Sequence, residues 1–87
     1  MFHLTIATLE KVIYEDEVSS LILPGAMGYF EILTNHAAII TFLKAGKVTI
    51  VTHKQEKLFY SITGGVFEFS HNKGALLADS IEIPSSN

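Results

Sequence analysis

Residues 58–69 read LFYSITGGVFEF, and this stretch carries the pattern that indicates the fold class. Leu58, Tyr60 and Ile62 alternate with other residues before the two glycines, and Phe67 and Phe69 alternate with Val66 and Glu68 after them. A period of two is typical of β-strands, whose successive side chains point to opposite faces. Gly64-Gly65 therefore predicts a tight turn or a bulge between two strands.

The same pattern extends over most of the chain. Phe2, Leu4 and Ile6 alternate with polar or small residues, and no stretch shows a convincing helical stripe. Turn signals separate the apolar runs about every 8–12 residues, which is typical of a sandwich or barrel of short strands. Glu15-Asp16-Glu17 is interpreted as one such solvated turn, and Asn35 to Ile40 as at most a single helical turn. Further strands are expected at 19–23, 39–43, 48–51, 74–79 and 80–83.

Composition limits the classes of protein. The 87 residues suffice for one domain with a modest core, and the chain has no cysteine for a disulfide or a thiolate metal site. It has six lysines, no arginine and a net charge of −3, so nucleic-acid binding is not expected. The longest apolar runs are too short for a membrane helix, and the N-terminus lacks the pattern of a signal peptide. We expect no membrane insertion.

No motif predicts catalysis. The histidines His3, His36, His53 and His71 are scattered without metal-ligand spacing, and Gly64-Gly65 belongs to no phosphate-binding motif. Asp79 is interpreted as a buried cap or a turn residue. We expect no catalytic residue, no metal and no cofactor.

Apolar residues on both faces of several strands leave two interpretations open. Phe59 lies beside Tyr60, and Phe67 lies near Phe69, which is more than one thin core requires. The first interpretation is a sandwich whose edges wrap around the core. The second is an apolar outer face that binds a partner.

Two other functional classes are alternatives to a docking protein. One is a free-standing module for a small ligand or sugar, using Phe59, Tyr60 and Phe69 as exposed aromatics. It requires a concave pocket with convergent polar groups. The other is a small metal-dependent enzyme, which requires two histidines within ligand range of one metal.

Three blocks carry a family resemblance. Residues 21–40 read LILPGAMGYFEILTNHAAII, residues 63–68 read TGGVFE and residues 75–79 read ALLAD. In this order and spacing they resemble the N-terminal domain of the epsilon subunit of F-type ATP synthases, which is called delta in mitochondria. The match covers nearly the whole chain. Departures are Glu31 in place of a frequent glycine, and Thr34, Ala38 and Ala45 in place of prolines.

The resemblance implies a fold and a function. The fold is a flattened β-sandwich of about ten short strands in two sheets, over residues 1–83, followed by a flexible polar tail at 84–87. The function is that of a non-catalytic rotor subunit in the central stalk, which docks on the gamma subunit and the c-ring and couples proton flow to ATP synthesis. Its location is peripheral, on the cytoplasmic side of the bacterial inner membrane.

The resemblance also assigns residues to partners. The c-ring contacts are Ala26, Met27, Gly28 and Tyr29, and the gamma contacts are Thr8, His36, Ile40 and Thr41. Many family members continue into two C-terminal helices that can inhibit ATP hydrolysis and in some members bind ATP. Because this sequence stops at Asn87, we expect a short form without those inhibitory helices.

Overall fold

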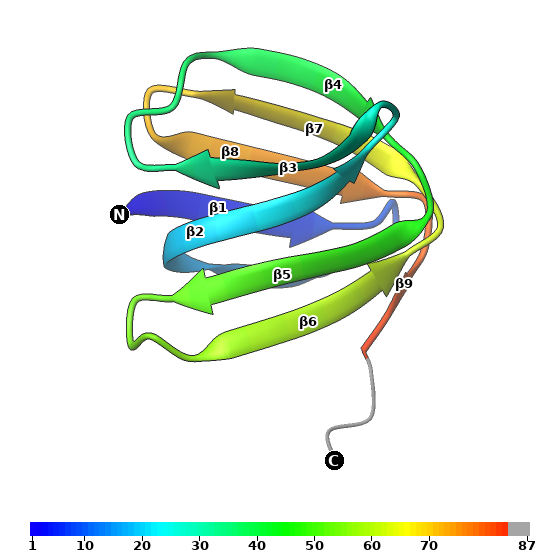
Figure 1. The fold of residues 1–87 in the computed structure, drawn as a ribbon. Helices are drawn as coiled ribbons and strands as arrows, with labels where there is room; N and C mark the ends of the chain where they lie inside the picture. Colours follow the sequence, from blue (N-terminus) through cyan, green and yellow to red (C-terminus); the bar gives the residue numbers. More distant parts are fainter. Residues whose placement is uncertain (84–87) are drawn as a thin grey trace.

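The computed structural model describes residues 1–83, which form nine β-strands and no helix (Figure 1). This confirms the predicted all-β class, and the Asn35 region forms a turn with a φ of 67° at that residue. The tail predicted at 84–87 lies outside the described residues. The strands are β1 Phe2–Ala7, β2 Val12–Gly25, β3 Gly28–Leu33, β4 Ile39–Leu43, β5 Gly46–Thr52, β6 Lys57–Ile62, β7 Gly65–Ser70, β8 Lys73–Ala78 and β9 Ile81–Glu82.

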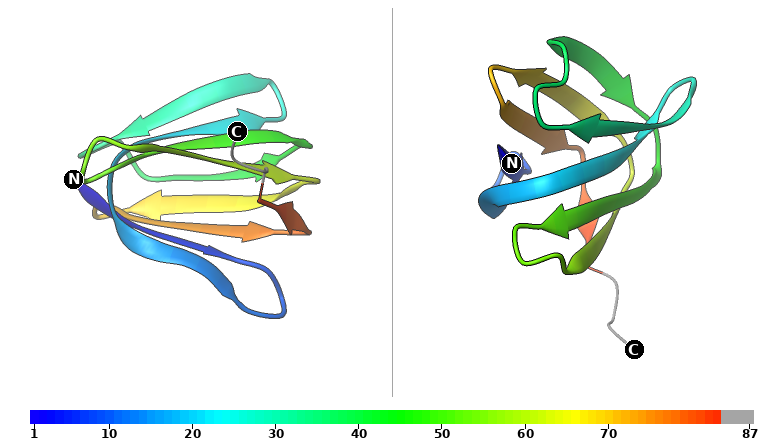
Figure 2. Two further views of the ribbon diagram at one scale, coloured as in Figure 1. Left: turned by 90° about the horizontal axis from the view of Figure 1, so that it is seen from below. Right: turned by 60° about the vertical axis from the view of Figure 1, so that its left-hand side comes forward.

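The strands form two layers that share one long strand (Figures 1 and 2). The first layer has the order β4, β7, β8, β1, and β1 then pairs with the first half of β2. The second half of β2 pairs with β3 on one side and with β5 on the other, and β5 continues through β6 to β9. The fourteen residues of β2 thus join both layers into one hydrogen-bonded network.

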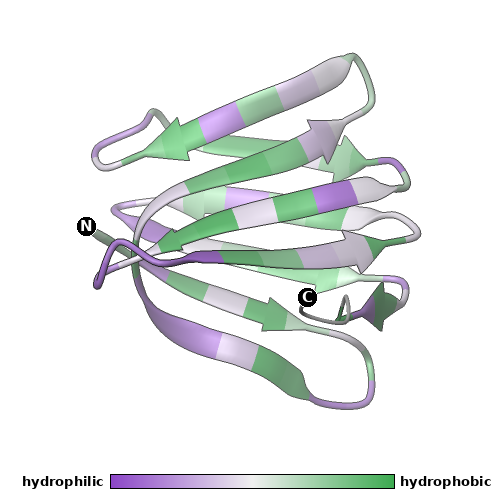
Figure 3. Cartoon of the chain, turned by 60° about the horizontal axis from the view of Figure 1, so that its bottom comes forward, coloured by the Kyte–Doolittle hydropathy of each residue, from purple (hydrophilic) through white to green (hydrophobic). Residues whose placement is uncertain are grey.

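The core lies between the layers and follows the predicted alternation. Phe2, Leu4 and Ile6 are buried from one layer, together with Phe67 and Phe69. The rings of Phe2 and Phe69 meet edge to face, with centroids 5.3 Å apart. Figure 3 shows the alternation of apolar and polar residues along the strands. Each fully buried side chain of this size contributes about 1.5–3 kcal/mol, so these inward positions hold the layers together.

Gly64-Gly65 connects the two layers and does not close a hairpin. β6 pairs with β5 and β9, whereas β7 pairs with β4 and β8. Gly64 has a φ of 151°, which favours glycine, and its carbonyl accepts a hydrogen bond from the Asp79 amide at 2.9 Å. Asp79 is therefore an exposed turn residue, which is one of its two predicted roles.

The prediction of a turn at Glu15-Asp16-Glu17 is wrong, because all three residues lie inside β2. Their partners on β1 are Thr5, Leu4 and His3. Two histidines, described below, lie within hydrogen-bond or ion-pair distance of these carboxylates. The sequence pattern could not show this, because those histidines are distant along the chain.

We predict that Gly65→Ala destabilises the fold by about 2 kcal/mol or more. A Cβ at this position would clash with the Leu77 carbonyl oxygen, so two strands of the first layer would have to separate. Urea unfolding of the purified chain measures the loss. Ser61→Ala, on an exposed position of β6, is the control and should change stability by less than about 0.5 kcal/mol. Equal stability of Gly65→Ala and the parent chain would contradict the packing described.

Candidate partner-binding surfaces

The outer face of the first layer carries a continuous row of apolar residues, here called the outer apolar row. In register, Phe42 of β4 pairs with Val66 of β7, Val66 with Leu77 of β8, Leu77 with Ala7 of β1, and Ala7 with Val12 of β2. Adjacent strands lie about 4.8 Å apart, so the row spans about 19 Å. Phe42 is 74% exposed, Val12 56% and Leu77 46%. These side chains serve no internal core.

The character of this face changes along the strands. The row next to the outer apolar row contains Ile40, Glu68, Ala75 and Thr5, and a row further from the β1–β2 loop contains Lys73, His3 and Glu17. The face therefore grades from apolar to charged over about 14 Å. Such a localised apolar patch with a polar rim is typical of a protein-binding surface.

The opposite outer face, on the second layer, is more polar. Its register rows combine Glu31, Ile22, Thr49 and Phe59 in one line, and Lys47 with Ser61 in another. The Lys47 ammonium lies 4.9 Å from the centroid of the Phe59 ring, so this aromatic is partly covered by a cation. A third row of this face contains Leu33, Ser20, Val51 and Lys57, and Leu33 is 50% exposed. On the second layer the exposed apolar residues are thus interspersed with polar ones, whereas on the first layer they form one continuous row.

The predicted c-ring contacts lie at the tip of the β2–β3 hairpin. Ala26 and Met27 form the turn, and the Met27 side chain is fully exposed, so it covers no part of the core. Gly28 has a φ of 130°, which a residue with a side chain rarely adopts. Tyr29 is 56% exposed, and its hydroxyl accepts a hydrogen bond from the Lys47 amide at 3.0 Å. Tyr29 thus has a structural role as well as an exposed surface.

The predicted gamma contacts do not form one cluster. Ile40 points outward on β4, next to Phe42 of the outer apolar row. Thr8 lies in the β1–β2 loop, three strands away, where its hydroxyl accepts a hydrogen bond from the Glu10 amide. The outer apolar row connects these two positions.

The other two gamma candidates lie elsewhere on β4 and the loop before it. Thr41 is half-buried and borders a shallow groove that it shares with the β2–β3 hairpin tip. The His36 ring stands edge to face on Phe69 with centroids 6.0 Å apart. His36 is therefore partly a packing residue, and Thr41 belongs to the same groove as the c-ring candidates.

Asn72 fixes the loop that carries His36. The Asn72 side chain accepts a hydrogen bond from the Asn35 amide at 2.7 Å and donates one to the Asn35 side-chain oxygen at 2.8 Å. Its own carbonyl accepts from the His3 amide at 3.0 Å. His71 and Asn72 have φ values of 51° and 58°, as a two-residue type I′ hairpin requires. One turn therefore anchors β1 and the entry to β4.

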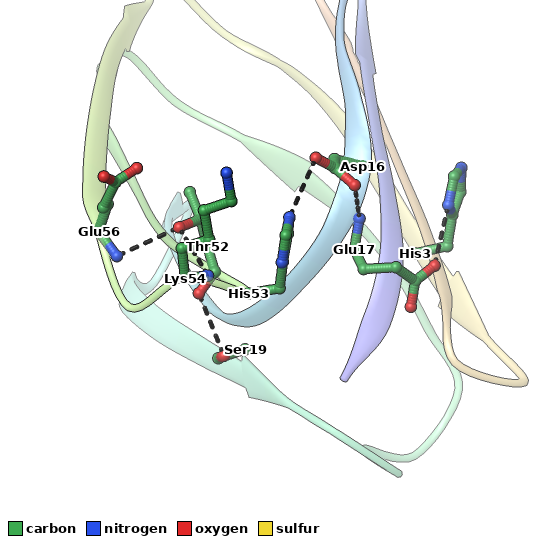
Figure 4. Close-up of polar contacts among 8 residues, drawn as sticks. All are labelled: His3, Asp16, Glu17, Ser19, Thr52, His53, Lys54 and Glu56. Atoms are coloured by element: carbon green, nitrogen blue, oxygen red, sulfur yellow. Dashed lines mark hydrogen bonds and ion pairs between the residues drawn. The ribbon is translucent and has the colours of Figure 1, made fainter.

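The acidic run of β2 is held by histidines from both sides (Figure 4). His3 contacts Glu15 at 3.0 Å and Glu17 at 3.2 Å through its two ring nitrogens. The hydrogen bond to Glu15, and next that to Glu17, raises the pKa of the His3 imidazole above its ordinary value of 6.5. On the other side of the strand, His53 lies 3.6 Å from Asp16.

Thr52 shapes the turn that presents His53. Its hydroxyl accepts hydrogen bonds from the amides of Lys54 at 3.2 Å and Glu56 at 3.1 Å (Figure 4). The Ser19 hydroxyl donates to the Thr52 carbonyl at 3.3 Å, which joins this turn to β2.

The geometry does not favour the two alternatives, a small-ligand or sugar-binding module and a metal-dependent enzyme. Phe69 and Tyr60 are buried in the core and Phe59 lies on an outer face, so the three aromatics do not line one binding pocket. Among residues 1–83, no three His, Cys, Asp or Glu side chains are arranged to hold a metal ion. The same part of the chain contains no helix able to cross a membrane.

The residues of the outer apolar row are not identified by the sequence pattern alone. Phe42, Val66, Leu77 and Val12 carry no motif, although an apolar outer face is one of the two interpretations that the pattern leaves open. The sequence does show that some strands carry apolar residues at both odd and even positions, which means that some of these side chains must face outward. Assigning them to one surface needs the register between strands, which is not encoded locally.

These observations define the class of protein: a small β-sandwich with an apolar outer face on one layer and an exposed hairpin tip. Residues 1–84 match the family model described as the ATP synthase, Delta/Epsilon chain, beta-sandwich domain. The chain belongs to this family.

Relatives agree with this assignment. The chain is 44% identical over 82 residues to the ATP synthase epsilon chain of Protochlamydia amoebophila, covering 94% of this chain and 56% of that one. It is 38% identical over 80 residues to the epsilon chain of Chlorobaculum tepidum, covering 92% of this chain and 91% of that one. The chain therefore spans little more than half of the first relative and most of the second.

Solved structures share the fold. A chain of the Euglena gracilis mitochondrial ATP synthase (OSCP/F1/c-ring) superposes with a TM-score of 0.87 at 17% identity, covering 92% of this chain and 51% of that chain. A chain of the Tetrahymena thermophila mitochondrial ATP synthase central stalk/c-ring superposes with a TM-score of 0.78 at 18% identity, covering 93% of this chain and 65% of that chain.

We predict that the stability of the chain depends weakly on pH through His3. Because the pKa of His3 is raised in the folded state, its contribution is fully present below about pH 6.5 and is lost as pH rises through the folded-state pKa. The side chains are 37–56% exposed, so the loss should stay below about 1 kcal/mol. Urea unfolding at about pH 6 and pH 8.5 measures it. His3→Gln should remove this part of the pH dependence; an unchanged slope in that variant would contradict the assignment.

We also predict that Asn72→Gly destabilises the chain by about 1 kcal/mol, because it removes two side-chain hydrogen bonds while keeping a backbone suited to positive φ. Thermal unfolding measures the loss. His71→Asn, in the same turn, keeps those bonds and should leave stability within about 0.5 kcal/mol of the parent. An equal loss of stability in both variants would contradict this prediction, because it would assign the loss to the turn itself and not to the two hydrogen bonds between Asn72 and Asn35.

Proposed function

We propose that this chain is a non-catalytic subunit of the central stalk of a bacterial F-type ATP synthase. In this role it is peripheral, on the cytoplasmic side of the inner membrane, and it docks on the gamma subunit and on the c-ring. Membership of the delta/epsilon β-sandwich family supports the complex, and the similar Tetrahymena chain belongs to a central stalk/c-ring assembly. The function is to pass rotation between partners and thereby couple proton flow to ATP synthesis.

The observation that carries the proposal is the outer apolar row. Phe42, Val66, Leu77 and Val12 belong to one surface across five strands and contribute nothing to the internal core. Covering them removes apolar area from water at about 25 cal/mol per Å², which favours association through this face. Ile40 borders the row and Thr8 lies near its far end, so these two of the four gamma candidates fit a partner lying along it, whereas His36 and Thr41 lie off the row.

The hairpin tip supplies the second contact. Met27 and Tyr29 project from the β2–β3 turn, and the Tyr29 hydroxyl bond to the Lys47 amide keeps the hairpin tied to β5. A flexible thioether and an amphipathic ring are suited to the repeating, shallow surface of a ring of loops. In the proposed role the first layer therefore contacts gamma, and the hairpin tip contacts the c-ring.

We predict that Leu77→Lys weakens binding to the purified gamma subunit about tenfold or more, because it removes apolar burial and places a charge in the interface. Isothermal titration calorimetry measures the affinity, and urea unfolding checks the fold. Ser61→Lys places the same charge on the second layer and should bind like the parent chain. Equal affinity of both variants, or no association of the parent chain at micromolar concentration, would contradict the proposal.

A further inference from the structure

Several strands within residues 1–83 have an edge that is open over all or part of its length, and they differ in how that edge is protected. The open parts of β2 and β6 carry the charged run 15–17 and Lys57. β9 is only two residues long and contains Glu82. β3 carries the exposed Glu31 in its middle. β4, which reads Ile39-Ile40-Thr41-Phe42-Leu43, has neither a charge nor a proline. Proteins normally blunt open edges with charges, prolines or very short strands, because an open edge can pair with another chain. β4 lacks these devices.

The open side of β4 can be assigned to particular backbone groups. β7 occupies one side of the strand, and the β2–β3 hairpin reaches the other side only at its end, where Gly25 pairs with Leu43. There the Lys44 amide donates to the Pro24 carbonyl at 2.9 Å, so the Lys44 amide points away from β7. Peptide groups of alternate residues point to the same side of an antiparallel strand. Those of Ile40 and Phe42 therefore also point to the open side.

The side chains of the same two residues are also exposed. Ile40 is 75% and Phe42 74% exposed, and both stand on the outer face, where Phe42 begins the outer apolar row. Backbone hydrogen-bonding groups and an apolar surface thus meet at one edge. An extended segment that pairs with β4 would satisfy the open backbone groups, and an element of the same partner lying beside it would cover the apolar side chains.

We propose that β4 is a docking strand to which an extended, uncharged segment of the gamma subunit adds as a further strand of the first layer. This inference rests on the proposed function, since it specifies how the gamma subunit engages a face already assigned to it. The segment is about four residues long, because the hairpin covers the Leu43 end. The side chains that it places on the outer face are apolar and lie beside Ile40 and Phe42.

A second copy of this chain fits the edge less well. Two copies joined edge to edge through β4 lie in one continuous sheet, so both outer apolar rows stay in water. Four paired residues also bury far less than the roughly 800 Å² per partner that stable interfaces need. A different partner can add a strand at the edge and continue over the row, which covers both surfaces together.

The test compares two substitutions at one position. Ile40→Pro removes the peptide N–H that points to the open side and leaves the bonds to β7 in place, as proline allows at an edge. Ile40→Ala removes most of the side chain and keeps the N–H. We expect Ile40→Pro to bind the purified gamma subunit about tenfold more weakly than Ile40→Ala, by calorimetry, with both variants folded by circular dichroism.

Amide hydrogen exchange on the parent chain gives a second measurement that needs no variant. In the free chain, the amides of Ile40 and Phe42 should exchange faster than that of Thr41, and the complex should slow them by about tenfold or more. Equal affinity of Ile40→Pro and Ile40→Ala, with unchanged exchange at Ile40 and Phe42, overturns strand addition while leaving gamma docking intact. No binding of the parent chain overturns both proposals.

Discussion

The architecture depends on β2 passing from one layer to the other. Val18 marks the crossing: it is fully buried, pairs with Phe2 of β1 in the first layer, and pairs with Thr52 of β5 in the second. An irregularity between Val18 and Ser20 lets the strand change partners. Because one strand belongs to both ladders, the positions of the two layers are fixed relative to each other. The shared core and the pairing of Gly25 with Leu43 of β4 support this connection, and the chain has no cysteine for a disulfide.

This constraint determines which surfaces remain for partners. The inward side chains of both layers are used by the core, and the outward side of the second layer mixes polar and apolar residues, with a cation over Phe59. The outward side of the first layer keeps Phe42, Val66 and Leu77 in solvent, and the hairpin that ends β2 carries Met27 beyond the body of the sandwich. In the proposed role, a rigid connection between these two surfaces is what a subunit placed between a stalk and a ring requires.

Much of the fold can be predicted from local patterns, and the exceptions have physical causes. The alternation at Phe2, Leu4 and Ile6 is a property of the strand itself, and the strand expected at 39–43 is confirmed. The acidic run at 15–17 is misassigned by its composition because its contact partners, His3 and His53, are brought near only by folding. For the same reason the outer apolar row cannot be identified locally, since five strands contribute one residue each. The partner residues rest on family resemblance, and the structure separates Thr8 from His36 while placing Ile40 beside the row.

In the proposed role, the outer face of the first layer is covered in the assembled enzyme. Carbene footprinting, which labels side chains according to their exposure, tests this most directly when the free chain is compared with the assembled ATP synthase. We expect labelling of Phe42, Leu77 and Val12 to fall strongly on assembly, while labelling of Phe59 on the opposite face changes little. Unchanged labelling of the first three, or protection of Phe59 in their place, would contradict this role for the face.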